Sequence, residues 1–170
     1  MPAGLKQTSS TVAIGFSVTE SAANTFTQAS VDLNLDPLNN EVFVVQAINL
    51  EASIPDALAA VDTEVLTSLT TTSQTAVQFL SNSNCLATKG NFIRAAGFVD
   101  GGVGFESGSG EAVPTTLEYL GIIATNDFFV QVKGTGNTAA KGLTGKLYGY
   151  RARANADIYA ALVQSEVLSA

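Results

Sequence analysis

The sequence contains no histidine and no tryptophan, and Cys85 is its only cysteine. Without an imidazole, a serine or cysteine nucleophile lacks the base that usually takes its proton, which excludes the common triad hydrolases. A single cysteine also excludes a disulfide framework within one chain, and it nearly excludes a zinc site built from histidine and cysteine. We expect Cys85 to be a small buried hydrophobic residue.

Charged residues are also scarce. They make up 14% of the chain, against about 25% in a typical domain. Because so few charges protect weakly against association, we expect much of the surface to contact other protein subunits rather than water. A monomer with a neutral surface is the alternative. The net charge of −7 argues against nucleic-acid binding by the whole surface and against docking on anionic lipid. We therefore expect no sequence-specific nucleic-acid binding.

Long apolar runs are missing as well. The run at residues 42–45 is short, and no segment approaches the roughly 18 apolar residues of a membrane-spanning helix. Residues 1–18 lack the continuous apolar stretch of a signal peptide. We therefore expect a protein that is made in the cytoplasm of a host and can still end in a particle released by lysis.

What the sequence does contain is a series of segments in which apolar and polar residues alternate, the pattern of half-buried strands. In residues 11–18 every second residue is apolar, and residues 41–53 are apolar on both faces around Val44, which predicts a central strand. Further strands are expected at residues 26–35, 64–70, 75–80, 85–98 with an interruption near Lys89, 115–124, 127–133 and 143–153. Residues 36–40 and 81–84 are expected to be turns, and residues 54–61, 100–110 and 134–142 are expected to be loops.

The C-terminal segment has a different pattern. Residues 155–168 carry apolar residues at roughly helical spacing, which predicts a short helix capped by Asp157; a final strand is the alternative. About eight strands joined by short turns predict an all-β fold, an antiparallel β-sandwich arranged as a single jelly roll. Since no linker or repeat divides the chain, we expect residues 1–170 to form one domain.

Three patterns could carry chemistry, and each has a simpler explanation. The glycine-rich residues 101–110 match neither a dinucleotide fingerprint nor a Walker motif, so we interpret them as a mobile surface loop. Asp62 and Glu64 would share one face of a strand, like the paired carboxylates of a glycosidase, but no tryptophan is available to stack on a sugar. The same pair, or Asp56 with Asp62, could bind calcium, although no EF-hand pattern is present. We expect no catalytic, cofactor-binding or metal-binding residues.

The basic residues are unevenly distributed. Residues 1–130 contain three basic residues and thirteen acidic ones, whereas residues 133–153 contain five basic residues and no acidic one. Those five are our candidates for contacts between subunits: Lys133, Lys141, Lys146, Arg151 and Arg153. They could form a basic strand pair that meets an acidic neighbour or a genome; the alternative is a solvated edge strand.

A family resemblance rests on two stretches. The segment DFFVQVKGTGNTAAKGLTGKLYGYRAR (residues 127–153) pairs a strand, a loop of small residues and a long strand that ends in basic residues. Together with EVFVVQAINLEASIPDA (residues 41–57), it resembles the small single jelly-roll capsid proteins of tailless icosahedral viruses. The resemblance implies two facing four-stranded sheets, no cofactor, a place in the virion, and contacts with copies of itself and with other capsid proteins.

One feature departs from that family. Some of its members hold the genome with a long basic arm, whereas residues 1–10 contain only Lys6. A shell over a membrane or over another protein layer therefore fits this chain better than direct packaging of a genome by an arm.

Two other functions stay open. The first is a carbohydrate- or receptor-binding β-sandwich in a fibre or adhesin, for which Tyr119, Tyr148, Tyr150 and Tyr159 would supply binding aromatics. The second is an extracellular filament subunit that assembles by strand donation, which requires an export signal that the N-terminus does not display.

Overall fold

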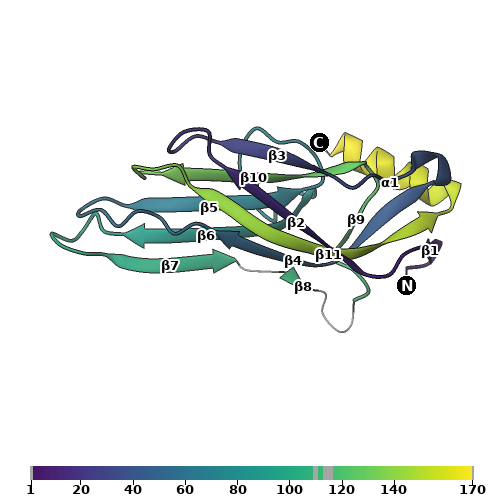
Figure 1. Ribbon diagram of the computed structural model, residues 1–170, viewed down its shortest axis with the longest axis horizontal. Helices are drawn as coiled ribbons and strands as arrows, with labels where there is room; N and C mark the ends of the chain where they lie inside the picture. Colours follow the sequence, from purple (N-terminus) through teal and green to yellow (C-terminus); the bar gives the residue numbers. More distant parts are fainter. Residues whose placement is uncertain (1, 109–110, 113–116, 170) are drawn as a thin grey trace.

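The computed structural model describes residues 2–108, 111–112 and 117–169, which form two facing antiparallel sheets and a C-terminal helix (Figure 1). The six-stranded sheet contains β1 (Leu5–Gln7), β2 (Val12–Thr19), β4 (Glu41–Ala52), β8 (Glu111–Ala112), β9 (Gly121–Ile123) and β11 (Gly142–Ala154). The five-stranded sheet contains β3 (Thr27–Asp32), β5 (Thr63–Thr70), β6 (Cys85–Arg94), β7 (Val103–Gly108) and β10 (Asp127–Thr135).

The strand order is that of a jelly roll. In one sheet β11 lies between β2 and β4, and β8 and β9 pair with the other side of β4. In the other sheet the order is β3–β10–β5–β6–β7. Most connections therefore cross from one sheet to the other, as in a double Greek key. The predicted antiparallel sandwich is confirmed. The described residues form eleven strands, because β1 and β7 extend the sheets and the two short strands β8 and β9 pair with the same side of β4.

Most strands lie where the alternation places them, with three corrections. Residues 75–80 are not a strand, because they belong to the β5–β6 connection, where the Gln78 amide donates to the Ser68 hydroxyl instead of joining a ladder. β6 continues through Gly90 without interruption, since the ring of Phe92 lies against that glycine and fills the space of its missing side chain. In the described part of residues 115–124 only Gly121–Ile123 is a strand.

The predicted loop at residues 100–110 is also wrong in part. Residues 103–108 form β7, which pairs with β6 so that Phe105 lies opposite Phe92. All six residues of β7 are exposed, as expected for this segment. Residues 109–110 lie outside the described residues. The glycines did not prevent a strand because Val103 and Phe105 alternate with small or polar residues.

The main core lies between the sheets. It includes Phe16 and Phe128, whose rings meet edge to face with centroids 5.7 Å apart. β4 is apolar on both faces for a structural reason: Tyr148 pairs with Ala47 and Gly149 pairs with Val45, so Gln46 is an extra residue that forms a bulge. Before the bulge, Val42 and Val44 of β4 belong to a second apolar cluster on the outer face of the six-stranded sheet.

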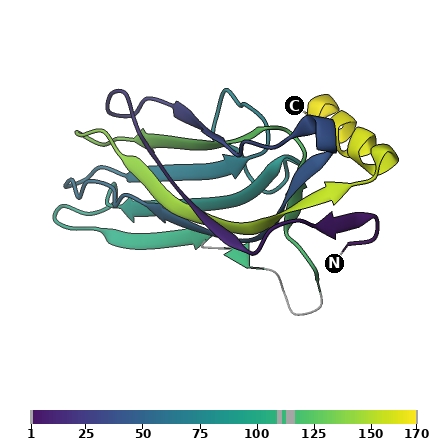
Figure 2. The same ribbon diagram turned by 45° about the vertical axis from the view of Figure 1, so that its right-hand side comes forward.

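That second cluster lies beneath α1 (Ala156–Leu168), which covers one end of the six-stranded sheet (Figure 2). The helix prediction for the tail is confirmed, but the cap is Asn155 rather than Asp157: the Asn155 side chain accepts from the Ile158 amide at 2.8 Å. Asp157 lies in the first turn, where a negative charge still favours the helix. Among the described residues, no helix is long and apolar enough to cross a membrane.

Candidate functional site

The five candidate contact residues do not form one basic face. β10 and β11 belong to different sheets, so the basic strand pair considered from the sequence does not exist. Lys133 is exposed and alternates with the buried Val132, which places it on the outer face of the five-stranded sheet. Lys146 is exposed and alternates with the buried Leu147, which places it on the outer face of the other sheet.

The two arginines lie at the other end of β11 and bind their own chain. Arg151 donates from Nη1 to the Asn34 carbonyl at 2.8 Å and to Glu41 Oε2 at 3.0 Å, and from Nη2 to the Leu33 carbonyl at 2.6 Å. Arg153 donates to Asn39 Oδ1 of the short 3₁₀ helix η1 (Pro37–Asn39) at 3.0 Å. These contacts fasten the β3–β4 connection to β11, and a role between subunits stays a prediction.

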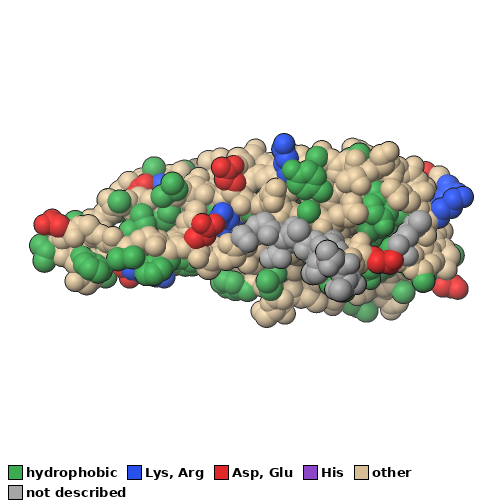
Figure 3. All heavy atoms as spheres, turned by 90° about the horizontal axis from the view of Figure 1, so that it is seen from below, with side chains coloured by type: hydrophobic (Ala, Val, Ile, Leu, Met, Phe, Trp, Pro, Cys, Tyr) green, Lys and Arg blue, Asp and Glu red, His purple; other side chains and the backbone are tan. Residues whose placement is uncertain are grey.

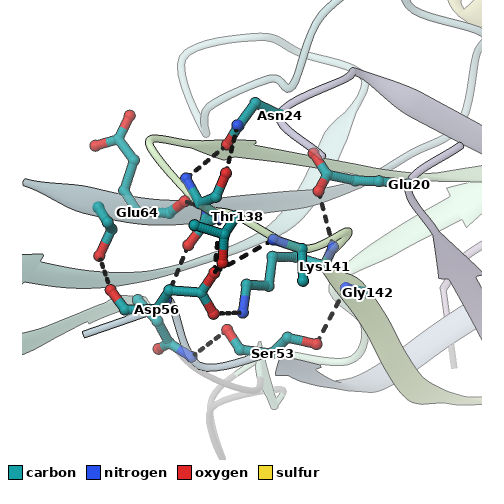
Figure 4. A network of polar contacts seen from close by, with 12 residues as sticks. Glu20, Asn24, Ser53, Asp56, Glu64, Thr138, Lys141 and Gly142 are labelled. Atoms are coloured by element: carbon teal, nitrogen blue, oxygen red, sulfur yellow. Dashed lines mark hydrogen bonds and ion pairs between the residues drawn. The ribbon is translucent and has the colours of Figure 1, made fainter. Parts of the chain in front are cut away.

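Lys141 belongs to a polar network at the opposite end (Figure 4). Its ammonium binds Asp56 Oδ1, and only 11% of its side chain is exposed. The other carboxylate oxygen of Asp56 accepts from the Thr138 amide and hydroxyl, both at 2.7 Å. The Lys141 and Thr138 hydrogen bonds hold the pKa of Asp56 well below its usual value of 3.8. Asp56 is thus a fixed anion that joins the β4–β5 and β10–β11 connections.

Neighbouring side chains extend this network to the β2–β3 connection. Glu20 is buried, and its carboxylate accepts from the Gly134 amide at 2.7 Å and the Lys141 amide at 2.8 Å. The Asn24 side chain donates to the Asn137 carbonyl at 2.7 Å and accepts from the Asn137 backbone amide at 2.8 Å. The Asn137 side chain also accepts from the Asp56 amide at 2.9 Å. Three connections at one end of the sandwich are therefore held together by side-chain hydrogen bonds.

Asp62 ties in the β6–β7 connection. Its Oδ1 accepts from the Ala95 and Ala96 amides at 2.8 and 2.9 Å, which lowers the pKa of Asp62. Arg94 lies 3.6 Å from the other oxygen of Asp62 and 3.5 Å from Glu64. The carboxylates considered for sugar hydrolysis or calcium are thus engaged by donors of their own chain. In the described part of the chain, no group of three or more His, Cys, Asp or Glu residues could hold a metal ion.

Cys85 lies where the sequence predicts, buried at the start of β6. Its thiol donates weakly to the Ala87 carbonyl at 3.5 Å. Desolvation raises the pKa of Cys85 to about 11, so the thiol stays protonated near neutral pH. Because the thiolate is the nucleophile, this residue has a packing role.

Tyrosines on the surface are fewer than the sequence suggests. Tyr150 is buried, and Tyr159 is half-buried because it packs against the cluster beneath α1. Tyr119 is exposed. Tyr148 lines a shallow hollow of about 560 Å³ on the six-stranded sheet, together with polar residues that include Asn49 and Lys146.

Large apolar side chains are exposed at several places on the surface. They include Ile54 and Val61 in the β4–β5 connection, Phe98 and Val99 after β6, and Val103 and Phe105 on β7. Figure 3 views the molecule from the side on which β7 lies in Figure 1, and it shows hydrophobic side chains gathered at the left end. Two features of this region were missed from the sequence. The glycines of β7 obscure its strand pattern, and nothing in the sequence places Glu20 near Lys141.

No protein-family model matches the sequence, and no curated protein matches it either. Among solved structures, the chain is similar to one from Desmodium yellow mottle tymovirus, with a TM-score of 0.33 and 12% identity, covering 88% of this chain and 92% of that chain. It is also similar to a chain from turnip yellow mosaic virus, with a TM-score of 0.27 and 12% identity, covering 82% and 93% of the two chains. Both matched chains are named after plant viruses.

Proposed function

We propose that this chain is a coat subunit, which assembles with copies of itself into a viral capsid shell. The observation that supports this most is the jelly roll itself, with β2–β11–β4 facing β3–β10–β5–β6. Double-sheet jelly rolls include viral capsid domains, lectin domains and cupins. No reaction is part of the proposal, because the carboxylates and the thiol that could start one are engaged within the fold.

The polar network supports the same function. Asp56, Asp62 and Glu20 fix the connections at one end of the sandwich, and the same end exposes apolar side chains such as Ile54 and Val99. A surface that is already rigid loses little conformational freedom when a neighbour binds. The ends of the sandwich are therefore suited to contacts with copies of the chain, with other capsid proteins, or with a membrane or protein layer beneath a shell.

Size measurement tests the proposal without any assay of activity. Purified full-length chain is followed by light scattering over a range of concentrations, and assembled material is imaged by negative stain. Closed shells or rings of discrete size are expected. Filaments would support the filament alternative instead, and a chain that stays monomeric at every concentration would overturn the coat function.

The candidate basic contacts are tested in the same assay. Lys146→Glu changes an exposed residue on one outer face, and Lys133→Glu makes the same change on the other. Impaired assembly of only one variant would assign a contact to that sheet face. If both assemble like the wild type, these two lysines are solvated and make no contact between subunits.

The hollow beside Tyr148 supports a second candidate, recognition of a carbohydrate. The partly buried ring of Tyr148 lies beside amide, hydroxyl and charged groups, a mixture of apolar and polar groups that suits a small ligand such as a sugar. Screening the chain on a glycan array tests it, with Tyr148→Ala as the variant expected to lose any signal. A signal that survives this substitution would place recognition elsewhere.

A further inference from the structure

The strand β7 ends the five-stranded sheet and has one neighbour, β6, among the strands that the structure describes. An antiparallel strand directs alternate N–H and C=O groups to its two sides, so the side of β7 away from β6 carries backbone donors and acceptors without a ladder partner there. Such an edge is a template for another strand. Proteins usually protect such edges with lysine, proline or a bulge, and β7 contains no lysine or proline.

The charge on β7 does not prevent a like strand from approaching. Glu106 is its only charged residue, and it forms an ion pair with Lys89 of the neighbouring strand. The face of β7 that carries Glu106 also carries Gly104 and Gly108, which have no side chains to block a neighbouring strand. The opposite face presents Val103 and Phe105, whose exposed fractions are 45% and 56%. The edge is therefore apolar and locally neutral.

We propose that β7 pairs antiparallel with β7 of a second copy, which joins two five-stranded sheets into one. The occupant is a second copy because the proposed coat function, on which this inference rests, already requires contacts between copies. The neutral edge also allows the contact in spite of the net charge of −7 on each chain.

Pairing rules select the register of this contact. In an antiparallel pair, directly opposite residues have their side chains on the same face of the sheet. When the two strands are identical copies related by a two-fold axis, the residue at the axis must therefore lie opposite the same residue of the other copy. An axis at Glu106 would place two carboxylates directly opposite each other, which is unfavourable. An axis at Gly104 shortens the overlap within β7. An axis at Phe105 pairs residues 103–107, sets each Glu106 opposite a glycine, and places two phenylalanine rings side by side.

The first test introduces an edge charge. In Phe105→Lys, two ammonium groups would face each other at the axis, so we expect roughly a tenfold or greater rise in the concentration needed for assembly. Leu38→Lys is the matched control, because Leu38 is 93% exposed in η1, which lies in the β3–β4 connection outside both sheets. Assembly of Phe105→Lys at the wild-type concentration, with wild-type assembly intact, would overturn the β7 contact and leave the coat function standing. A wild type that never assembles would overturn both.

The second test does not depend on how well the lysine variant folds. Phe105→Cys places a thiol at the axis, where opposite Cα atoms of about 4.5–5.5 Å separation suit a disulfide, while the native thiol of Cys85 is buried. Mild oxidation should give a dimer linked between the two copies of position 105, identified by mass spectrometry, whereas Leu38→Cys should stay unlinked. A linkage that forms only when Phe105→Cys is mixed with Ser30→Cys on the opposite edge strand, β3, would overturn the proposed pairing in favour of a head-to-tail array.

Discussion

Replacing Arg151 by alanine tests whether this residue stabilises its own chain. The guanidinium makes three hydrogen bonds, to Glu41 and to the carbonyls of Leu33 and Asn34. The two carbonyls belong to the connection between β3 and β4, and Glu41 is the first residue of β4, so one side chain holds this connection and the start of β4 to the end of β11. Arg151→Ala removes all three bonds together with the packing of the aliphatic stem.

The cost can be worked from these contacts. Hydrogen bonds to a charged group contribute about 1.5–3 kcal/mol each when well shielded. A third of the Arg151 side chain is exposed, so water replaces part of each bond. Glu41 also keeps the Asp36 amide as a donor at 3.0 Å. Taking about 1 kcal/mol for each bond gives a loss of about 3 kcal/mol in the free energy of unfolding.

Urea unfolding followed by circular dichroism measures this loss. With a slope of about 2 kcal/mol per molar urea, the midpoint should fall by about 1.5 M. Lys146→Ala is the matched control: it removes one exposed positive charge from the same strand and should change stability by no more than about 0.5 kcal/mol. If Arg151→Ala unfolds at the same urea concentration as Lys146→Ala, the contacts of Arg151 do not stabilise the fold, and the residue is free to act between subunits.

Three further outcomes follow from the titrating groups. Hydrogen bonding lowers the pKa of Asp56 from 3.8, so its contribution to the free energy of unfolding is present above about pH 4 and is lost as the pH falls through the lowered pKa. Asp56→Asn should therefore make the melting temperature depend less on pH in acid, and an unchanged dependence would contradict this. Burial raises the pKa of Glu166 from 4.5, although its carboxylate accepts from the Ala124 and Thr125 amides. The pH dependence is therefore opposite to that of Asp56, because stability is lost as the pH rises through the raised pKa. Over that pH range the melting temperature of Glu166→Gln should rise relative to that of the wild type, measured in parallel. Cys85, with its pKa raised to about 11, should react with a thiol reagent only after unfolding, and rapid labelling of the native chain would show that the site opens.

The sandwich could be predicted from the sequence because some strands alternate between buried and exposed residues and others, such as β4, are continuous apolar runs. In β2, Phe16 and Val18 are buried while Ser17 and Thr19 are exposed, so the period of two is visible without a structure. β7 was missed because its alternation is limited to Val103 and Phe105 in a glycine-rich segment, and all of its residues are exposed. Residues 75–80 show the reverse case, an apolar segment whose backbone is held by a side chain of β5.

The polar network could not be predicted because its partners are distant in the chain. Glu20 meets Gly134 and Lys141, and Asp56 meets Thr138, through the jelly-roll crossings that bring the ends of β2, β4 and β10 together. A sequence shows that Glu20 follows a strand, but it does not show which amides face it. For the same reason, the short spacing of the basic residues in the chain allowed a basic strand pair as one possibility, although β10 and β11 lie in different sheets.

This distribution of charge bears on how copies would recognise each other. Lys89, Arg94, Lys141 and Arg151 each pair with an acid of their own chain, at both ends of the sandwich. Once paired, these residues present little charge to a neighbour, and exposed ion pairs contribute only about 0–1 kcal/mol each. Affinity between copies must then come mainly from apolar surface such as Phe105 and from backbone pairing, with exposed lysines adjusting register. Raised salt should therefore weaken assembly only modestly, and complete dissociation in salt would show that charge, not the β7 edge, holds the subunits together.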